Sequence, residues 1–556
     1  MNLDHALLDY DLVLLAAIAE RRGAEITASQ QREAAAQLAE ALLAPDSLQE
    51  VITWLSAEQR AALDALLAAG GSLPAARFGR RYGTVRRMGP GRLAREKPWR
   101  DPQNPVEALY YAGLVFFTFD EIAGQIVETA FVPDDLLPLL PPVEAEAEGL
   151  NIVTLSAPRV IRDSGRAFAE DLATLLACAE KGALYPRDLA CLNERLMRPQ
   201  EKESSRLALL LHQARALNLL QLDGGKFTLQ RPATREWLKA DPPWQMLALQ
   251  KSWRDDAEWN DLWRVPSLRP ERTGWRNDPL AARARVLEHL SCCPTDEWID
   301  LKSFVTAIKQ IDPDFQRPPD AYNTWYIRDS GGEYLMGYEH WDRVEGALIA
   351  YLIGGPLYWL GVTALGFEDK DAALPSAFRL TAGGAFFLGL ADQPPAEPSL
   401  PPLVMEADLR VRALAGGDLY DRFQLARIAE WQSSGEVFFY RLTRDSLKRT
   451  LNRGISLEQV LSFLRRITGD KVPPQAIETL RGWAGDQSQV RLIRAAVLEA
   501  KPASVMGELR ARPDISSLLG EPISPTRSLV GEENWQELLA RLRQAGYLPL
   551  KGEQRR

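Results

Sequence analysis

Apolar and polar positions alternate between a helical period and a strand period along most of the chain. Residues 56–71 (SAEQRAALDALLAAGG) carry apolar residues at helical spacing, with Ser56 at the N-cap position and two glycines after the last turn. A short segment (LPAARFGRRYG) follows, and residues 104–119 then run from a helix into a strand. Residues 125–140 supply the return strand after a hairpin tip at residues 120–124. This order predicts helix, helix, helix and a two-stranded wing.

The same order recurs twice further along the chain. Residues 166–229 contain three helical patterns and a hairpin centred on Gly224 and Gly225, a dipeptide that favours tight hairpin turns. Residues 279–390 repeat the three helices, interrupted by a long insertion, and end in another hairpin. We therefore predict a mainly α fold with small β-hairpins, built as a tandem array of winged-helix domains.

Residues 403–556 break this pattern and predict an α+β module. We expect a strand at 403–414, a helix at 418–435 and a strand at 436–443, followed by helices capped by Thr443 and Ser456. A strand at 489–500, a helix at 537–547 and an edge strand at 547–550 complete the prediction. Proline-rich connectors divide the chain into four predicted domains, at residues 1–145, 146–245, 246–400 and 401–556.

Composition indicates a folded protein and narrows the chemistry. With 46% hydrophobic and 25% charged residues, the chain of 556 residues matches globular proteins, and its net charge of -9 excludes a molecule that is polycationic throughout. Four cysteines and four histidines stand without ligand spacing, which argues against structural zinc and a disulfide framework. The first residues do not resemble a signal peptide, so we expect a cytoplasmic protein.

One long apolar stretch, residues 347–365, is either a membrane span or a segment of the protein core. It carries no charge, but glycines and Pro356 interrupt it and amphipathic sequence flanks it. We therefore expect a buried helix that leads into a strand, and no contact with a membrane. The tryptophans 244, 253, 259 and 263 of the second connector are interpreted as the lining of a bridging helix, with base stacking as the less favoured alternative.

The sequence contains no motif that supports catalysis. The phosphate-binding pattern G-x-x-x-x-G-K-[ST] is absent, and the Gly-Gly-Lys at 224–226 precedes a phenylalanine inside the predicted hairpin. There is no G-x-S-x-G nucleophile motif. We predict that the protein is not an enzyme and has no catalytic residues, metal site or cofactor. A metal-dependent nuclease hidden among the carboxylates stays open as a minor alternative.

Charge is concentrated in one segment, residues 77–100, which we call the basic segment. It holds nine cations and a single acid, Glu96, and so carries a local charge of +8. Arginine-rich runs neutralise phosphates and give affinity for DNA that is largely independent of sequence. Tyr82 and Trp99 are candidates for base stacking. The predicted DNA contacts are Arg77, Arg80, Arg81, Arg86, Arg87, Arg92, Arg95, Lys97 and Arg100.

The basic segment has two alternative interpretations. It is either a solvated basic loop or a dock for an acidic face, on this chain or on a partner protein, because guanidinium groups pair with carboxylates as readily as with phosphates. Winged helices also serve as protein-docking modules, so the fold does not decide between these alternatives.

Residues 437–483 resemble a known module. They are similar to the N-terminal module of XPB-type DNA repair and transcription helicases, which bacterial helicase-associated domain proteins also contain. The matching features are Arg441-Leu442-Thr443, Ser446-Leu447, Gly454-Ile455-Ser456, Phe463-Leu464, Pro473-Pro474, Trp483 and the ending Gly546-Tyr547-Leu548-Pro549. The resemblance implies a role in recognising distorted DNA or recruiting a partner. No motor sequence accompanies the module here, so unwinding is not expected.

These observations give two functional hypotheses. The first is a non-enzymatic accessory protein of bacterial DNA repair or transcription that binds duplex or forked DNA mainly through phosphates. Its contacts would come from the basic segment and from Arg444, Lys448 and Arg449 on the helix after Thr443. The rival is a protein-interaction scaffold that docks a separately encoded helicase, nuclease or transcription component.

Overall fold

The computed structural model describes most of the chain, with gaps. The described residues are 1–122, 125–141, 150–182, 184–188, 192–197, 205–319, 321–396, 400–485, 496–531 and 534–550. Contacts divide the chain into two compact units. The first comprises residues 1–405, 410–441 and 467–469, and the second comprises residues 406–409, 442–466 and 470–556. The predicted division into four domains stays a prediction.

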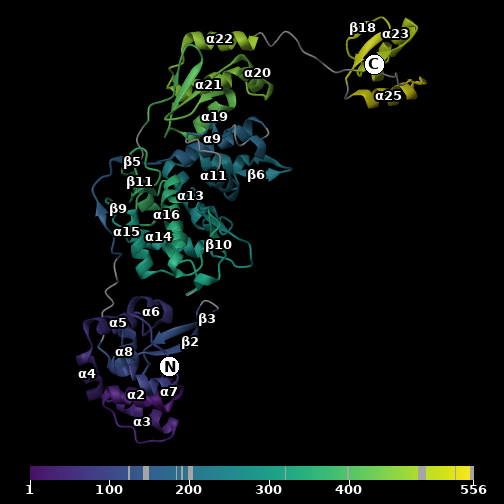
Figure 1. The fold of residues 1–556 in the computed structure, drawn as a ribbon. Helices are drawn as coiled ribbons and strands as arrows, with labels where there is room; N and C mark the ends of the chain where they lie inside the picture. Colours follow the sequence, from purple (N-terminus) through teal and green to yellow (C-terminus); the bar gives the residue numbers. More distant parts are fainter. Residues whose placement is uncertain are drawn as a thin grey trace. The chain divides into compact units, whose positions relative to one another are not determined.

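Residues 1–140 fold into helices around one small antiparallel sheet (Figure 1). The elements are α1 (Leu3–Leu8), α2 (Leu12–Arg22), α3 (Gln31–Leu43), α4 (Pro45–Trp54), α5 (Ala57–Ala68), β1 (Ser72–Pro74), α6 (Ala75–Tyr82), α7 (Pro90–Glu96), η1 (Pro98–Arg100), α8 (Pro105–Tyr111), β2 (Phe116–Ile122), β3 (Gln125–Phe131) and η2 (Leu137–Leu139). The strand order is β1-β3-β2. Ser56 caps α5 in a capping box with Gln59, as its position predicts.

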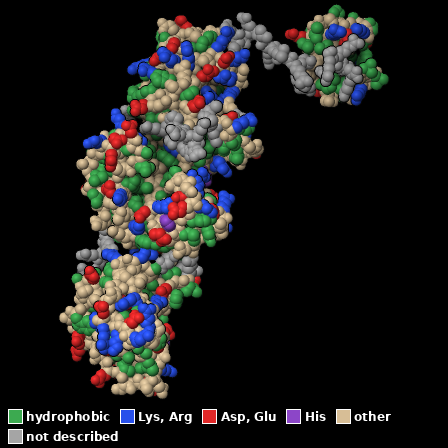
Figure 2. All heavy atoms as spheres, viewed as in Figure 1, with side chains coloured by type: hydrophobic (Ala, Val, Ile, Leu, Met, Phe, Trp, Pro, Cys, Tyr) green, Lys and Arg blue, Asp and Glu red, His purple; other side chains and the backbone are tan. Residues whose placement is uncertain are grey.

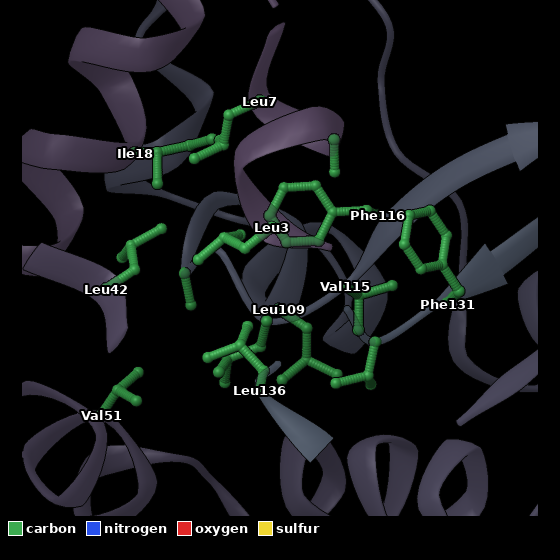
Figure 3. Close-up of a cluster of buried hydrophobic side chains, with 14 of the residues drawn as sticks. Leu3, Leu7, Ile18, Leu42, Val51, Leu109, Val115, Phe116, Phe131 and Leu136 are labelled. Carbon is green, nitrogen blue, oxygen red and sulfur yellow. The ribbon is translucent and has the colours of Figure 1, made fainter. Parts of the chain in front are cut away.

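One apolar core joins the N-terminal helices to this sheet. Leu3, Ile18 and Leu42 from α1, α2 and α3 contribute to the same buried cluster as Leu109 of α8 and Phe131 of β3 (Figure 3). Burial of apolar side chains is the main favourable term in folding, about 25 cal/mol per Å² removed from water. The core therefore fixes α8 and the hairpin against the N-terminal helices, which the sequence pattern did not predict.

Residues 150–390 repeat the arrangement twice. Their elements are β4 (Thr154–Leu155), β5 (Val160–Arg162), α9 (Ala167–Lys181), η3 (Pro186–Asp188), α11 (Ser205–Ala216), β6 (Leu220–Asp223), β7 (Lys226–Leu229), α12 (Arg231–Lys239), α13 (Pro242–Arg254), η4 (Leu262–Arg264), β8 (Leu268–Pro270), α14 (Pro279–Ser291), β9 (Trp298–Asp300), α15 (Leu301–Ile311), η5 (Ala321–Asn323), β10 (Ile327–Asp329), η6 (Tyr338–His340), η7 (Asp342–Gly346), α16 (Ala347–Gly354), α17 (Pro356–Trp359), β11 (Thr363–Phe367), β12 (Ala377–Leu380) and α18 (Ala382–Phe387). The apolar stretch at 347–365 is a helix leading into a strand, as expected.

The strand connections of these two repeats match those of the first. In the second repeat, Leu184 forms a single antiparallel bridge with Phe227 of β7, and β7 pairs with β6. In the next repeat the strands lie in the order β4-β9-β12-β11-β5. In each case the extended segment that follows the first helix pairs with the last strand of the hairpin. Gly224 and Gly225 adopt positive φ angles at the β6–β7 turn, which confirms the predicted hairpin.

Residues 403–441 form a four-stranded antiparallel sheet with one helix. The elements are β13 (Val404–Met405), β14 (Arg410–Leu414), α19 (Leu419–Ile428), β15 (Glu430–Ser433) and β16 (Val437–Arg441), and the sheet order is β13-β14-β16-β15. The α19 helix packs on α9 of the second repeat. Arg422 of α19 is buried there beside Glu170, with their side chains 3.1 Å apart.

The remaining elements complete the C-terminal part. They are α20 (Arg444–Asn452), α21 (Leu457–Thr468), α22 (Pro474–Gly485), β17 (Ala496–Glu499), α23 (Ala503–Ala511), α24 (Pro513–Ser516), β18 (Pro522–Ser524), β19 (Arg527–Val530) and α25 (Trp535–Gln544). The last three strands form a sheet in the order β17-β19-β18. Leu509, Val530 and Leu538 contribute to a small core of this final segment.

Several predicted elements of the C-terminal part were wrong. The strand expected at 403–414 is two paired strands, because a turn reverses the chain and Leu409 adopts a φ of +68°. The helix expected to reach residue 435 ends at Ile428, and the following residues join the sheet beside β16. Residues 547–550 form no strand. The first half of the strand predicted at 489–500 lies outside the described residues, and β17 covers 496–499.

Candidate nucleic-acid interface

The basic segment spans α6, α7 and η1 and lies between β1 and α8 in the chain. Figure 2 shows Lys and Arg side chains gathered over one face of the N-terminal residues. Seven of the nine predicted contact residues are exposed, from Arg81 onward, whereas Arg77 and Arg80 are half-buried. Exposure alone does not make a cation available, because many of these side chains have partners within the chain.

Arg86 is held by a buried carboxylate. Its Nε and Nη2 donate to the two carboxylate oxygens of Glu107 on α8, each at 2.8 Å, in a forked pair. The same carboxylate accepts the backbone N–H groups of Arg86 and Gln103. Burial by itself would raise the pKa of Glu107, but these four hydrogen bonds hold it below its usual value. Glu107 therefore acts as a clamp that holds the loop before α7 against α8.

The α8 helix does not offer a free face. Val106, Ala108, Leu109 and Tyr111 are all buried, as is Glu107. A recognition helix places side chains on base edges in the major groove, which requires an open face. The α8 helix presents no such face, and the loop and α7 remain as the accessible part of the basic segment.

Arg77 and Arg80 contact the insertion of the third repeat, within the first unit. Arg77 donates to the carbonyl of Ile311, and the guanidinium of Arg80 lies 3.4 Å from a carboxylate oxygen of Asp314. Arg80 also stands over the ring of Tyr338, at 4.4 Å from its centroid. These two arginines therefore contact acceptors on the same chain, as the interpretation of the basic segment as an intramolecular dock requires.

Three more arginines form surface ion pairs. Arg87 pairs with Glu128 on β3, Arg92 with Glu96 at 2.7 Å, and Arg100 with Glu20 on α2 at 2.5 Å. Hydrogen bonds from Arg92 and Arg100 lower the pKa values of Glu96 and Glu20. All three arginines stay exposed, and exposed pairs of this kind contribute little to stability because water and salt screen them. A phosphate can therefore compete for these side chains, at the cost of releasing a carboxylate.

Arg95 and Lys97 form no ion pair in the part of the chain that the structure describes, and both are exposed. Their backbone is fixed because Leu93 of α7 and Trp99 of η1 are buried in a cluster with Tyr111. Trp99 is only 5% exposed, so the expectation that it stacks on a base was wrong. Tyr82 packs against Phe78, with ring centroids 5.4 Å apart.

The predicted contacts after Thr443 lie on one face of α20. Thr443 caps the helix in a capping box with Ser446, and Ser446, Leu447 and Thr450 are buried. Arg444, Lys448 and Arg449 are exposed on the opposite face. The structure thus gives this helix a cationic outer surface in the second unit, separate in sequence from the basic segment.

Sequence reasoning missed the acids that contact the basic segment. Glu20, Glu107 and Glu128 stand outside residues 77–100 in the chain and reach it only through the fold. Their sequence positions carry no signal for this role, since single acids on amphipathic elements are common. Among the described residues, no group of three or more His, Cys, Asp or Glu side chains is placed to hold a metal ion.

A comparison with known protein families finds a match for one part of the chain. Residues 403–524 match the family model of the helicase conserved C-terminal domain. This match begins just before β13 and ends at β18, so it includes the residues that carry the helicase resemblance up to Trp483. No curated protein matches the chain. Across the described residues, no helix is both long and apolar enough to cross a bilayer.

Proposed function

We propose that the protein is a non-enzymatic DNA-binding accessory protein that works with a separately encoded helicase. In this proposal it acts in the cytoplasm of a bacterium, in DNA repair or transcription. The observation that carries the proposal is the match of residues 403–524 to a helicase family domain, and the chain also has exposed cationic surfaces on α7 and α20. Within that family, the motif residues from Arg441 to Trp483 favour the module found at the N-terminus of XPB-type helicases.

The repeated order of elements supports a tandem winged-helix array. In all three repeats, the extended segment that follows the first helix pairs with the second strand of the hairpin; in the second repeat this segment is the single residue Leu184. A winged helix brings two helices and a hairpin together in this way, and such modules bind DNA in many proteins. Because the same fold also docks proteins, the assignment to DNA depends on the cationic surfaces.

We propose that the protein contacts phosphates without reading bases through α8. Arg92 and Arg95 are three residues apart on α7 and so share a helical face, and Lys97 follows directly. Arg81, Arg87 and Arg100 extend this surface. Arg77 and Arg80 are half-buried, and Arg86 forms a forked pair with the buried Glu107, so we assign these three a smaller share of the binding. Phosphate contacts of this kind position DNA but carry no sequence information.

A salt-dependent binding experiment tests this proposal. Fluorescence anisotropy would measure affinity for labelled duplex and forked DNA at about 50 and 200 mM salt, where each phosphate contact steepens the salt dependence. The variant R92E/R95E/K97E is expected to lose at least tenfold in affinity at the lower salt. The exposed Arg32 of α3 gives the control variant R32E, which is expected to bind like the wild type. Absence of binding by the wild-type chain at low salt would contradict the proposal.

The scaffold hypothesis stays as a second candidate because of the first hairpin. Phe119 is 68% exposed and Ile126 is 79% exposed, and the register places both on the same face of β2 and β3. Glu121 stands opposite Ile126 on that face. An exposed apolar face with acids suits a basic, apolar segment of a protein partner better than it suits DNA. Loss of helicase co-purification in a F119S/I126S variant that still binds DNA would support this role.

A further inference from the structure

A second arginine-rich loop contains none of the predicted DNA contacts, although it includes Trp263, for which base stacking is the less favoured interpretation above. It spans residues 263–276, which we call the Trp–Arg loop, and it joins η4 to α14 in the first unit. The loop contains four arginines and one acid, Glu271, and so carries a local charge of +3. Glu271 is held by Arg328 at 2.6 Å, outside the loop. The charge of the four loop arginines is therefore not offset within the loop.

A buried ion pair holds the chain just before the loop in place. The Nε of Arg283 on α14 donates to Asp261 at 2.6 Å, and both side chains are buried. The same guanidinium donates to the carbonyls of Trp253 and Asp256, near the end of α13. These carbonyls belong to the end of a helix, where backbone acceptors lack helical partners. The anchor fixes where the loop starts.

The four arginines of the loop have exposed side chains. Arg264, Arg269, Arg272 and Arg276 form no ion pair among the described residues. Arg269 donates to the carbonyls of Pro266 and Leu268, which holds its side chain over the loop backbone. An unpaired exposed guanidinium can bind a phosphate without first releasing a carboxylate.

Two of these arginines stand over tryptophan rings, and one of those rings belongs to a stack of three. Trp275 stacks between Trp263 and Trp325, with centroid separations of 5.9 and 5.0 Å and interplanar angles of 20° and 18°. The guanidinium of Arg272 stands over the ring of Trp263 at 5.6 Å. Arg264 stands over the buried ring of Trp259 at 4.5 Å. A guanidinium stacked on a ring keeps its N–H donors directed outward, in the plane that a phosphate approaches.

We infer that the Trp–Arg loop is a second nucleic-acid site, which binds a segment of single-stranded DNA. In this site the base of one nucleotide continues the stack on the outer side of Arg272, and the loop arginines contact the flanking phosphates. Single-stranded binding sites combine a cationic surface with planar groups on which bases stack, and such stacking tolerates any base. A base in a duplex is already stacked on both faces, which is why we assign the unpaired strand. The inference rests on the proposed function in that the protein binds DNA, but it uses different residues.

The first experiment measures anisotropy of a labelled oligothymidylate of about 20 nucleotides with the full chain. The variant R272E/R276E is expected to lose at least tenfold in affinity for this oligonucleotide. The matched control is R215E/R235E, which makes the same charge change at exposed positions on α11 and α12. An equal loss in both variants, or no loss in R272E/R276E, would overturn the inference.

A second measurement separates stacking from charge and does not depend on the folding of a charge-reversal variant. R272K keeps the positive charge but removes the planar guanidinium, so it is expected to keep the salt dependence and weaken oligothymidylate binding about threefold.

Photocrosslinking of an oligonucleotide containing 5-iododeoxyuridine to the wild-type chain is expected to label peptides that contain residues 263–276. Crosslinks found only at other residues would overturn the assignment.

The two proposals fail in different ways. Duplex binding that is lost in R92E/R95E/K97E, with oligothymidylate binding unaffected by R272E/R276E, would reject the Trp–Arg loop and leave the proposed function standing. Oligothymidylate binding lost only in R272E/R276E, with no effect of R92E/R95E/K97E on any DNA, would reject the basic segment and support the loop.

Discussion

The two arginine-rich regions of the first unit differ in what their charges contact. The basic segment is the richer in sequence, with nine cations, but Arg80, Arg86, Arg87, Arg92 and Arg100 have carboxylate partners and Arg77 has a carbonyl acceptor. The Trp–Arg loop has four arginines, and none of them pairs with a carboxylate in the described chain. The number of cations in a segment therefore does not measure the charge that is available to a ligand.

The contacts that hold the two regions in place differ as well. A forked pair with Glu107 holds the basic segment through one of its own arginines, Arg86. The Trp–Arg loop is held by Arg283, which lies outside it, and by a stack of tryptophan rings. The first region therefore uses part of its charge for structure, whereas the second keeps its own arginines for the surface.

The largest expected effect comes from removing the anchor of the Trp–Arg loop. R283A leaves Asp261 buried without its cation and removes the guanidinium donor from the carbonyls of Trp253 and Asp256. Breaking a buried pair in this way costs about 3–5 kcal/mol of unfolding free energy. Hydrogen exchange is expected to show faster opening of α13 and α14, with the N-terminal helices unchanged. Unchanged exchange in α13 and α14 would show that the pair does not support the loop.

A smaller loss of stability is expected at the clamp of the basic segment. E107Q removes the charge and one good acceptor, and a hydrogen bond of a charged group contributes about 1.5–3 kcal/mol. Because the folded pKa of Glu107 is lowered, its stabilisation is present at neutral pH and is lost as the pH falls through that folded pKa. Chemical denaturation near pH 7 should therefore separate E107Q from the wild type, and the difference should shrink in acid.

The salt dependence of DNA binding distinguishes the regions with single substitutions. R272A removes an arginine without a carboxylate partner, so the slope of log affinity against log salt is expected to fall by about 1, with roughly a threefold to tenfold loss of affinity. R87A removes an arginine that Glu128 already neutralises, so its change in slope is expected to be smaller. Anisotropy titrations at four salt concentrations provide the measurement. A larger change in slope for R87A would reverse the comparison.

The smallest expected effect comes from releasing the surface pairs of the basic segment. E20Q and E96Q remove the partners of Arg100 and Arg92, and each is expected to change stability very little, because both pairs are exposed to solvent. If carboxylates mask the charge of this region, the double variant is expected to bind duplex DNA about twofold to threefold more tightly. The control S29A, at an exposed loop position, should bind like the wild type. Unchanged affinity of the double variant would argue that these pairs do not compete with phosphate.

Local sequence signals predicted much of the architecture because helix caps, glycine turns and apolar periodicity act within a few residues. The helix after Ser56 and the hairpin at Gly224 and Gly225 form as expected. The prediction was wrong where strand pairing overrides local preference. Residues 430–433 continue a helical pattern in sequence, but pairing with β16 places them in the sheet.

Sequence patterns alone predict the order of most helices and hairpins, the position of the basic segment and the likeness of residues 437–483 to a helicase module. Which cations are available to a ligand depends on the fold. Glu20, Glu107 and Glu128 come to the basic segment from distant elements, and Trp325 joins Trp275 from 50 positions along the chain. Ion pairing and ring stacking depend on distances of a few ångströms, which are set by the packing of the whole core rather than by neighbours in sequence.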